Sequence, residues 1–173
     1  MQDLDLPRDD QLTSVEYQLL PGDSLSEGAL YDVVSLGVRL RFSSGIARVF
    51  TWQMTRGAGS LVAMDSAQAN ELSWFEDVTA RQDSIVGTAL TRVITTTHET
   101  DEGSRPWAAR LLWGNGSSLV IALGERGDDG EPTYIPDSLI VTSDQGTASS
   151  FHPSSAGSSA WGQDSVRGEP APR

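Results

Sequence analysis

The sequence predicts a mainly β fold of antiparallel hairpins, arranged as one sheet or a partly open sandwich with one or two short helices. Two patterns lead to this prediction. Apolar and polar residues alternate with a period of two in several stretches, as on a strand with one buried face. Short segments rich in glycine, serine and asparagine separate these stretches as turns. The chain has 173 residues and no cysteine, so a core must form without disulfides, which this length permits.

The first three strands are predicted between residues 15 and 54. Residues 15–19 alternate strictly, and Pro21-Gly22-Asp23 ends that segment as a turn. Residues 36–42 then place Leu, Val, Leu and Phe on one face, and residues 46–54 return with Phe, Trp and Met. Ser43-Ser44-Gly45 joins them, with glycine free to take positive φ. This hairpin is predicted to lie near the centre of the fold.

The second half of the chain predicts a helix and a second hairpin. Residues 65–72 could form one short helix, and residues 89–97 are rich in Thr, Val and Ile, which strands favour. Residues 107–123 predict a hairpin around Asn115-Gly116, because both residues tolerate positive φ. A last strand is predicted within 134–141, with Pro136 at its start or at a sheet edge.

These elements define one domain. Residues 14–151 are expected to form a single β-rich domain, preceded by a flexible lead-in at 1–13. Residues 152–173 consist mainly of Ser, Gly, Ala, Pro and charged residues, with few large apolar side chains. Such a segment buries too little surface to offset the entropy of ordering, so a disordered tail is predicted.

The charge balance favours some partners over others. Twelve basic residues, all arginine, stand against twenty-four carboxylates, which gives a net charge of −12. Nucleic acids and anionic membranes are disfavoured as partners, whereas a basic protein would be attracted. The start of the chain does not resemble a secretory signal, and no apolar run approaches a membrane span. A cytoplasmic location is therefore expected.

The chain carries little catalytic equipment. Without lysine and cysteine it has no Schiff-base amine, thiol nucleophile or thiolate metal site. His98 and His152 are its only histidines, and no G-x-S-x-G motif supports a serine nucleophile. Glycine patterns of nucleotide-binding loops are absent, and Asp128-Asp129-Gly130-Glu131 lacks the order of a calcium-binding loop. We expect no cofactor, no metal and no catalytic residue.

Two groups of residues are candidates for binding a partner. Arg39 and Arg41 lie two residues apart, on the outward face of the first predicted hairpin. Arginines so placed can bind carboxylates, either of a partner or of this chain itself. Asp128, Asp129 and Glu131 form an acidic loop that could attract a basic partner.

Part of the sequence resembles a group of bacterial proteins. The stretch Trp113-Gly-Asn-Gly-Ser-Ser-Leu-Val-Ile-Ala-Leu-Gly-Glu125, an acidic loop and Tyr134-Ile-Pro-Asp-Ser-Leu-Ile-Val141 are similar to small uncharacterised acidic proteins of GC-rich bacteria. The resemblance covers roughly residues 30–145. Some acidic, cysteine-poor β proteins of this kind are immunity partners of toxins, so the resemblance implies an immunity-like role without any catalytic motif.

Composition and resemblance together predict a non-enzymatic protein-binding module, of the immunity or accessory type, that caps a basic partner. The alternative is a small ligand-binding domain or a hydrolytic β domain that uses carboxylates and aromatic side chains. A third reading is an assembly subunit whose sheet edge pairs with another chain.

Overall fold

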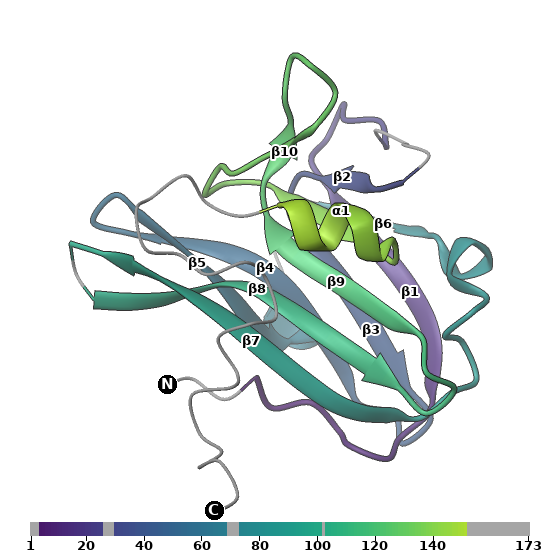
Figure 1. Ribbon diagram of the computed structural model, residues 1–173. Helices are drawn as coiled ribbons and strands as arrows, with labels where there is room; N and C mark the ends of the chain where they lie inside the picture. The colour runs from purple at the N-terminus through teal and green to yellow at the C-terminus, as the bar shows by residue number, and fades with distance from the viewer. Residues whose placement is uncertain (1–3, 26–29, 69–72, 102, 152–173) are drawn as a thin grey trace, which may run out of the picture.

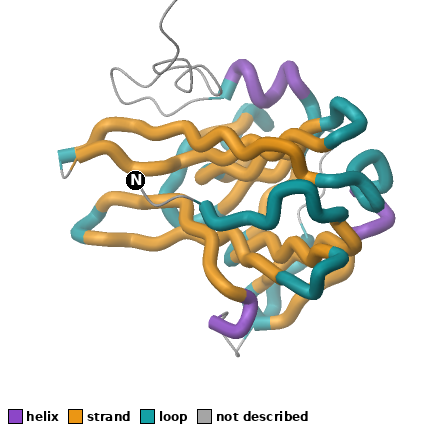
Figure 2. Tube along the Cα trace, turned by 90° about the horizontal axis from the view of Figure 1, so that it is seen from below, coloured by secondary structure: helices purple, strands orange, loops and turns teal. Residues whose placement is uncertain are grey.

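The computed structural model describes residues 4–25, 30–68, 73–101 and 103–151, which form two antiparallel five-stranded sheets packed face to face (Figures 1 and 2). The first sheet has the strand order β5 (Ala58–Asp65), β4 (Ala47–Thr55), β3 (Gly37–Phe42), β1 (Leu12–Leu19) and β6 (Trp74–Asp77). The second has the order β2 (Asp32–Val34), β12 (Leu139–Thr142), β9 (Ser118–Leu123), β8 (Gly103–Trp113) and β7 (Leu90–Thr100). The mainly β prediction is confirmed.

Five short elements complete the described fold. Strands β10 (Glu125–Arg126) and β11 (Pro132–Thr133) form a small separate hairpin. The 3₁₀-helices are η1 (Ser66–Gln68) and η2 (Thr79–Gln82), and the single described α-helix is α1 (Gln145–Ser150). Both predicted hairpins lie inside their sheets: β3 and β4 in the first, β8 and β9 in the second. Neither occupies an edge.

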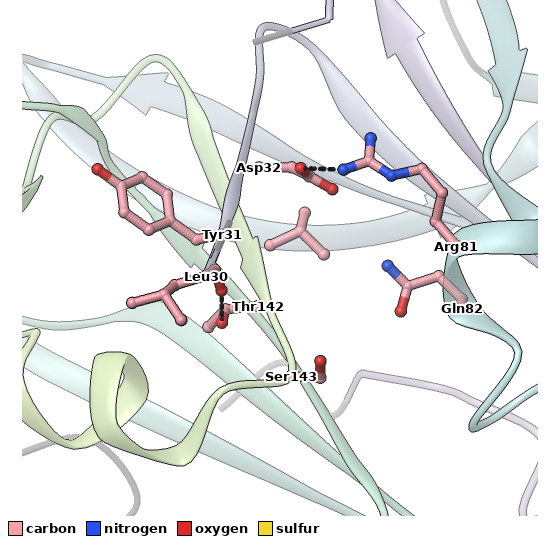
Figure 3. Close-up of a pocket in the computed structure, with 8 residues that line it drawn as sticks. Leu30, Tyr31, Asp32, Arg81, Gln82, Thr142 and Ser143 are labelled. Carbon is pink, nitrogen blue, oxygen red and sulfur yellow. Dashed lines mark hydrogen bonds and ion pairs between the residues drawn. The ribbon is translucent and has the colours of Figure 1, made fainter. Parts of the chain in front are cut away.

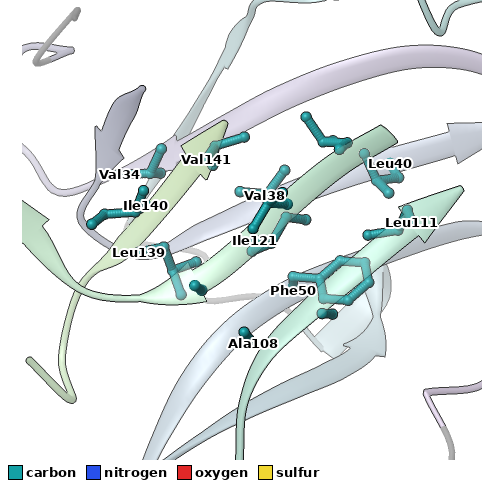
Figure 4. Packing of buried hydrophobic residues seen from close by; sticks show 14 of the residues in the cluster. Val34, Val38, Leu40, Phe50, Ala108, Leu111, Ile121, Leu139, Ile140 and Val141 are labelled. Carbon is teal, nitrogen blue, oxygen red and sulfur yellow. The ribbon is translucent and has the colours of Figure 1, made fainter. Parts of the chain in front are cut away.

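The hydrophobic core lies between the two sheets. Val38, Leu40 and Phe50 of the first sheet pack against residues of the second sheet that include Ile121 and Leu139 (Figure 4). All five side chains are essentially inaccessible to solvent. The alternation read from the sequence places Val38, Leu40 and Phe50 on the buried face, as predicted, whereas Met54, predicted for the same face as Phe50, is 42% exposed.

The second sheet is also covered on its outer side, by α1 (Figure 1). Asp144 caps this helix, since its carboxylate accepts a hydrogen bond from the Thr147 N–H at 2.6 Å. Gln145 Nε2 donates to Ser118 Oγ of β9 at 2.7 Å. Phe151, just after the helix, contacts Trp107 edge-on with ring centroids 5.4 Å apart. This coverage explains why every residue of β9 and β12 is buried.

Several local predictions differ from the structure. Of the helix predicted at 65–72, the described part forms only η1, and residues 69–72 lie outside the described residues. The last strand begins at Leu139 and not at Pro136. Pro136 packs closely against Gly59 of β5 in the first sheet, where a Cβ atom on Gly59 would lie 2.3 Å from Pro136 Cβ. Helix α1 was not predicted.

The chain ends also bear on the predicted boundaries. Leu4 and Leu6, within the lead-in predicted at 1–13, belong to the buried core cluster. Strand β1 begins at Leu12, and Asp9 N–H donates to the carbonyl of Leu90 at 2.8 Å. The predicted tail at 152–173 lies outside the described residues.

Candidate functional site

Three hairpin loops of the protein share one turn geometry. They are 42–46, 113–117 and 127–131, and in each the fourth residue is a glycine with φ between 84° and 88°. The N–H of that glycine donates to the first residue's carbonyl, and the first residue's N–H donates to the fifth residue's carbonyl. This is a type I turn followed by a left-handed residue. In the predicted Asn115-Gly116 turn, Gly116 takes positive φ and Asn115 does not.

The third residue of each loop supports the turn with its side chain. Ser44 Oγ, Asn115 Oδ1 and Asp129 Oδ1 each accept a hydrogen bond from the N–H two residues ahead, at 3.4, 3.0 and 3.0 Å. Such side-chain acceptors are the usual stabilisers of turns. Asp129 therefore has a structural role, which asparagine fills in the related loop.

The acidic candidates lie on β10, β11 and their loop, residues 125–133, which we call the acidic hairpin. Its four carboxylates are exposed, with one arginine among them: Glu125, Arg126, Asp128, Asp129 and Glu131. In Figure 1 this hairpin projects beyond the ends of the two sheets. It contains all three acidic residues predicted from the sequence to bind a partner.

The acidic hairpin is tied to the body of the protein through Tyr31. The Tyr31 hydroxyl donates to the carbonyl of Gly130 at 2.6 Å, and the Arg126 guanidinium lies 5.0 Å from the centre of the Tyr31 ring. Tyr31 directly precedes β2 and is itself buried. Burial raises the pKa of its hydroxyl, which therefore stays protonated as a donor at neutral pH. These contacts fix the loop relative to the second sheet.

The two candidate arginines lie elsewhere, on the outer face of the first sheet. Arg39 binds Glu16 of β1 through two hydrogen bonds of 2.5 and 2.7 Å, and Arg41 adds a third at 2.8 Å. Hydrogen bonds from Arg39, the largest effect, lower the pKa of Glu16. The Arg39 guanidinium also lies 3.4 Å from the centre of the Phe75 ring. Both arginines therefore bind a carboxylate of the same chain, Glu16. They lie in the first sheet, whereas the acidic hairpin is a separate two-stranded element.

A buried polar network closes the side of the sandwich where η2 meets β2. Asp32 is 5% exposed, and its carboxylate accepts a hydrogen bond from the Tyr17 hydroxyl at 2.9 Å. Its second oxygen accepts from Arg81 at 2.6 Å (Figure 3). Burial is the main reason that the pKa of Tyr17 is raised far above its usual value. Tyr17 therefore remains a neutral donor to Asp32.

This network forms the wall of a pocket. The pocket has a volume of about 130 Å³ and is lined by two chain segments and η2: Leu30, Tyr31, Asp32, Arg81, Gln82, Val141, Thr142 and Ser143. Because Tyr17 donates its only hydroxyl proton to Asp32, its oxygen must accept from Gln82 Nε2, at 3.4 Å. The amide orientation is thereby set, and Gln82 Oε1 remains an acceptor without a hydrogen bond among the described residues.

The sequence did not indicate this pocket. Tyr17, Asp32, Arg81 and Gln82 come from three separate segments, and none belongs to a recognisable motif. One weak signal was available: Asp32 occupies an otherwise apolar stretch, Tyr31-Asp32-Val33-Val34, where a buried carboxylate needs a partner. Nothing local identifies Arg81 as that partner.

The remaining candidates for chemistry are few among the described residues. His98 lies inside β7 rather than at its end; its ring is buried and packs 5.3 Å from the Tyr134 ring. The Gly59 backbone lies nearby, but neither ring nitrogen has a partner in hydrogen-bond geometry. His152 lies outside the described residues. In the described part of the chain, no three His, Asp or Glu side chains are grouped as metal ligands.

Comparisons with protein-family models, curated proteins and solved structures find no match to this chain. Within the described residues, no helix combines the length and apolar character needed to cross a bilayer.

Proposed function

We propose that this protein is a non-enzymatic binding module that caps a basic partner protein, as an immunity-type or accessory protein would. The acidic hairpin carries this proposal. It presents four exposed carboxylates on a projecting loop whose backbone is fixed by the turn hydrogen bonds and by Tyr31. A loop already ordered before binding loses less conformational entropy when a partner docks.

Electrostatics favours the same reading. The chain has a net charge of −12, so a basic partner is attracted from a distance before contacts form. The exposed carboxylates of the acidic hairpin then add short-range complementarity. Arg39 and Arg41 remain a weaker prediction as partner-binding residues, because Glu16 already binds both.

The hydrolytic alternative has less support. Hydrolysis by paired carboxylates needs two acidic groups at a defined separation. Asp32 is the single carboxylate among the residues that line the described pocket. Its two oxygens already accept hydrogen bonds from Tyr17 and Arg81, and the lining supplies no second carboxylate to pair with it.

The related loops suggest a variant that removes charge without disturbing the turn. Asp128→Ser and Asp129→Asn reproduce residue types found at the same positions of the other two loops, Ser43 and Asn115. Glu131→Gln removes the third charge. The matched control is Asp23→Asn, Glu76→Gln and Asp101→Asn, which removes three exposed charges elsewhere.

A partner is first captured from the native host with the intact protein, and association is then measured at low and at physiological salt. The acidic-hairpin variant should associate about tenfold more slowly at low salt, the lower end of electrostatic steering, and the difference should shrink as salt screens the charges. The control should retain most of the rate. An acidic partner, or equal rates for the hairpin variant and the unmodified protein, would contradict the proposal; equal slowing by the control would show that only total charge matters.

A further inference from the structure

The pocket beside η2 offers hydrogen-bonding groups that the fold does not use. Gln82 is 8% exposed, and its Oε1 has no hydrogen-bond partner among the described residues, because Nε2 is the atom that donates to Tyr17. Each carboxylate oxygen of Asp32 accepts one hydrogen bond in the structure and has a second lone pair available. Acceptors therefore line the inner wall of the pocket.

The rim of the pocket differs from its inner wall. Ser143 is exposed, and its hydroxyl can both donate and accept. Leu30, 59% exposed, adds an apolar surface across the pocket from Arg81 and Gln82 (Figure 3). Thr142, by contrast, is fully engaged: its hydroxyl donates to the Leu30 carbonyl at 2.5 Å and accepts from the Asp144 N–H at 2.9 Å.

Charge limits the class of ligand. Asp32 and Arg81 form an ion pair of 2.6 Å, with side chains 7% and 33% exposed, so the local charges cancel. A cation would be repelled by Arg81, and an anion would be repelled by Asp32. A neutral ligand avoids both penalties, and it can still donate to the acceptors of the inner wall.

Size and polarity point further. The volume of about 130 Å³ corresponds to roughly four water molecules at ~30 Å³ each, which suits one edge of a small ring better than a whole large ligand. Adjacent hydroxyl groups can donate to Gln82 Oε1 and to Asp32, and accept from Ser143. The C–H groups between them would contact Leu30.

We propose that this pocket binds the edge of a monosaccharide unit or another small uncharged compound with adjacent hydroxyl groups. This binding is separate from the capping of a protein partner and does not depend on the acidic hairpin.

The test is an NMR titration of the full chain with three methyl glycosides, those of glucose, mannose and galactose. Acetate and guanidinium serve as charged probes at matched ionic strength. At least one glycoside should give saturable shifts of the Gln82 side-chain amide and of the Ser143 backbone amide. Gln82→Met keeps the side-chain volume but removes the free acceptor, so the dissociation constant should rise about fivefold, the usual effect of one neutral hydrogen bond.

Two further variants make the result decisive. Ser143→Ala changes an exposed side chain and should weaken binding without affecting the fold, so it serves if Gln82→Met does not fold. Gln53→Met, on an exposed position of β4, is the matched control and should bind as the unmodified protein does. The proposal is overturned if no glycoside gives saturable shifts, if only a charged probe does, or if neither pocket variant weakens binding.

Discussion

Replacing Asp32 with alanine should destabilise the protein more than any surface charge substitution. The side chain of Asp32 is buried and accepts hydrogen bonds from Tyr17 at 2.9 Å and from Arg81 at 2.6 Å. Asp32→Ala leaves the Tyr17 hydroxyl, on a side chain that is 0% exposed, without its acceptor. It also removes the carboxylate that pairs with Arg81 at 2.6 Å.

The expected magnitude follows from the exposure of each group. Breaking a fully buried ion pair costs about 3–5 kcal/mol. Here the Arg81 side chain is 33% exposed, so water recovers part of that cost. The buried Tyr17 hydroxyl contributes about 1–3 kcal/mol as a donor without an acceptor. We therefore expect a loss of about 2–4 kcal/mol, or roughly 5–15 °C in Tm for a domain of this size.

Chemical denaturation at neutral pH measures the effect. Asp5→Ala is the control, because Asp5 pairs with Arg48 at 3.6 Å while its side chain is 94% exposed, and such pairs contribute little. Asp32→Ala should also cost about 1 kcal/mol less in a Tyr17→Phe background, since the two residues share one hydrogen bond. A loss no larger than that of Asp5→Ala, or no coupling with Tyr17→Phe, would refute the role assigned to this network.

Three further predictions concern the core and the turns. Gly124→Ala should cost about 1–3 kcal/mol in chemical denaturation, because the new Cβ would lie 2.6 Å from Phe151 Cζ and 2.9 Å from a backbone oxygen; an unchanged midpoint would mean that Phe151 does not pack there. Gly116→Val should lower the free energy of unfolding by about 1–3 kcal/mol, since Gly116 has a φ of 85°. An unchanged free energy of unfolding would mean that the turn does not hold Gly116 at positive φ. Burial lowers the pKa of His98, so the free energy of unfolding that the neutral ring contributes should be fully present above the unfolded-state pKa of about 6.5 and should fall as the pH drops below it. Urea midpoints at pH 7.5 and at pH 5 should differ less for His98→Phe than for the unmodified protein. An equal difference would assign the acid sensitivity to other groups.

A fourth prediction concerns the end of the described chain. A chain ending at Phe151 should keep its stability, because residues 152–173 have the composition of a segment that cannot bury much surface. A chain ending at Ser150 should lose about 2–4 kcal/mol, since it also removes the Phe151 ring from Trp107. Thermal unfolding of the two truncated chains, compared with the full chain, separates the effects. A large loss in the first truncation would contradict the tail prediction.

The sequence alone indicated the two central hairpins and the strands β1, β7 and β12, whereas β2, β5 and β6 were not predicted. Alternation at residues 36–50 indicated which side chains face the core, the Asn-Gly pair between two apolar runs indicated the hairpin at 107–123, and Gly45 and Gly116 marked the turns. These features are local, because a strand's period and a turn's torsion angles depend on a few neighbouring residues. The hydrogen bond made by the third residue of each turn is local as well, because it reaches an N–H only two residues ahead.

The contacts of the candidate sites could be predicted from the sequence only in part. The spacing of Arg39 and Arg41 placed both on one outward face, but only the pairing of β1 with β3 put Glu16 opposite Arg39 and within hydrogen-bond reach of Arg41. The acidic loop was predicted as a loop, whereas its anchoring to Tyr31 depends on a residue 99 positions away in the chain.

Tertiary structure alone decided which strands share a sheet and which polar groups meet inside. Asp32 pairs with Tyr17 and Arg81, which are 15 and 49 positions away from it in the chain. The sequence pattern limits which face of each strand is buried, but many strand orders would satisfy that pattern equally. The packing of the two sheets selects one order, and the pocket exists because that packing places η2 beside β2 and β12.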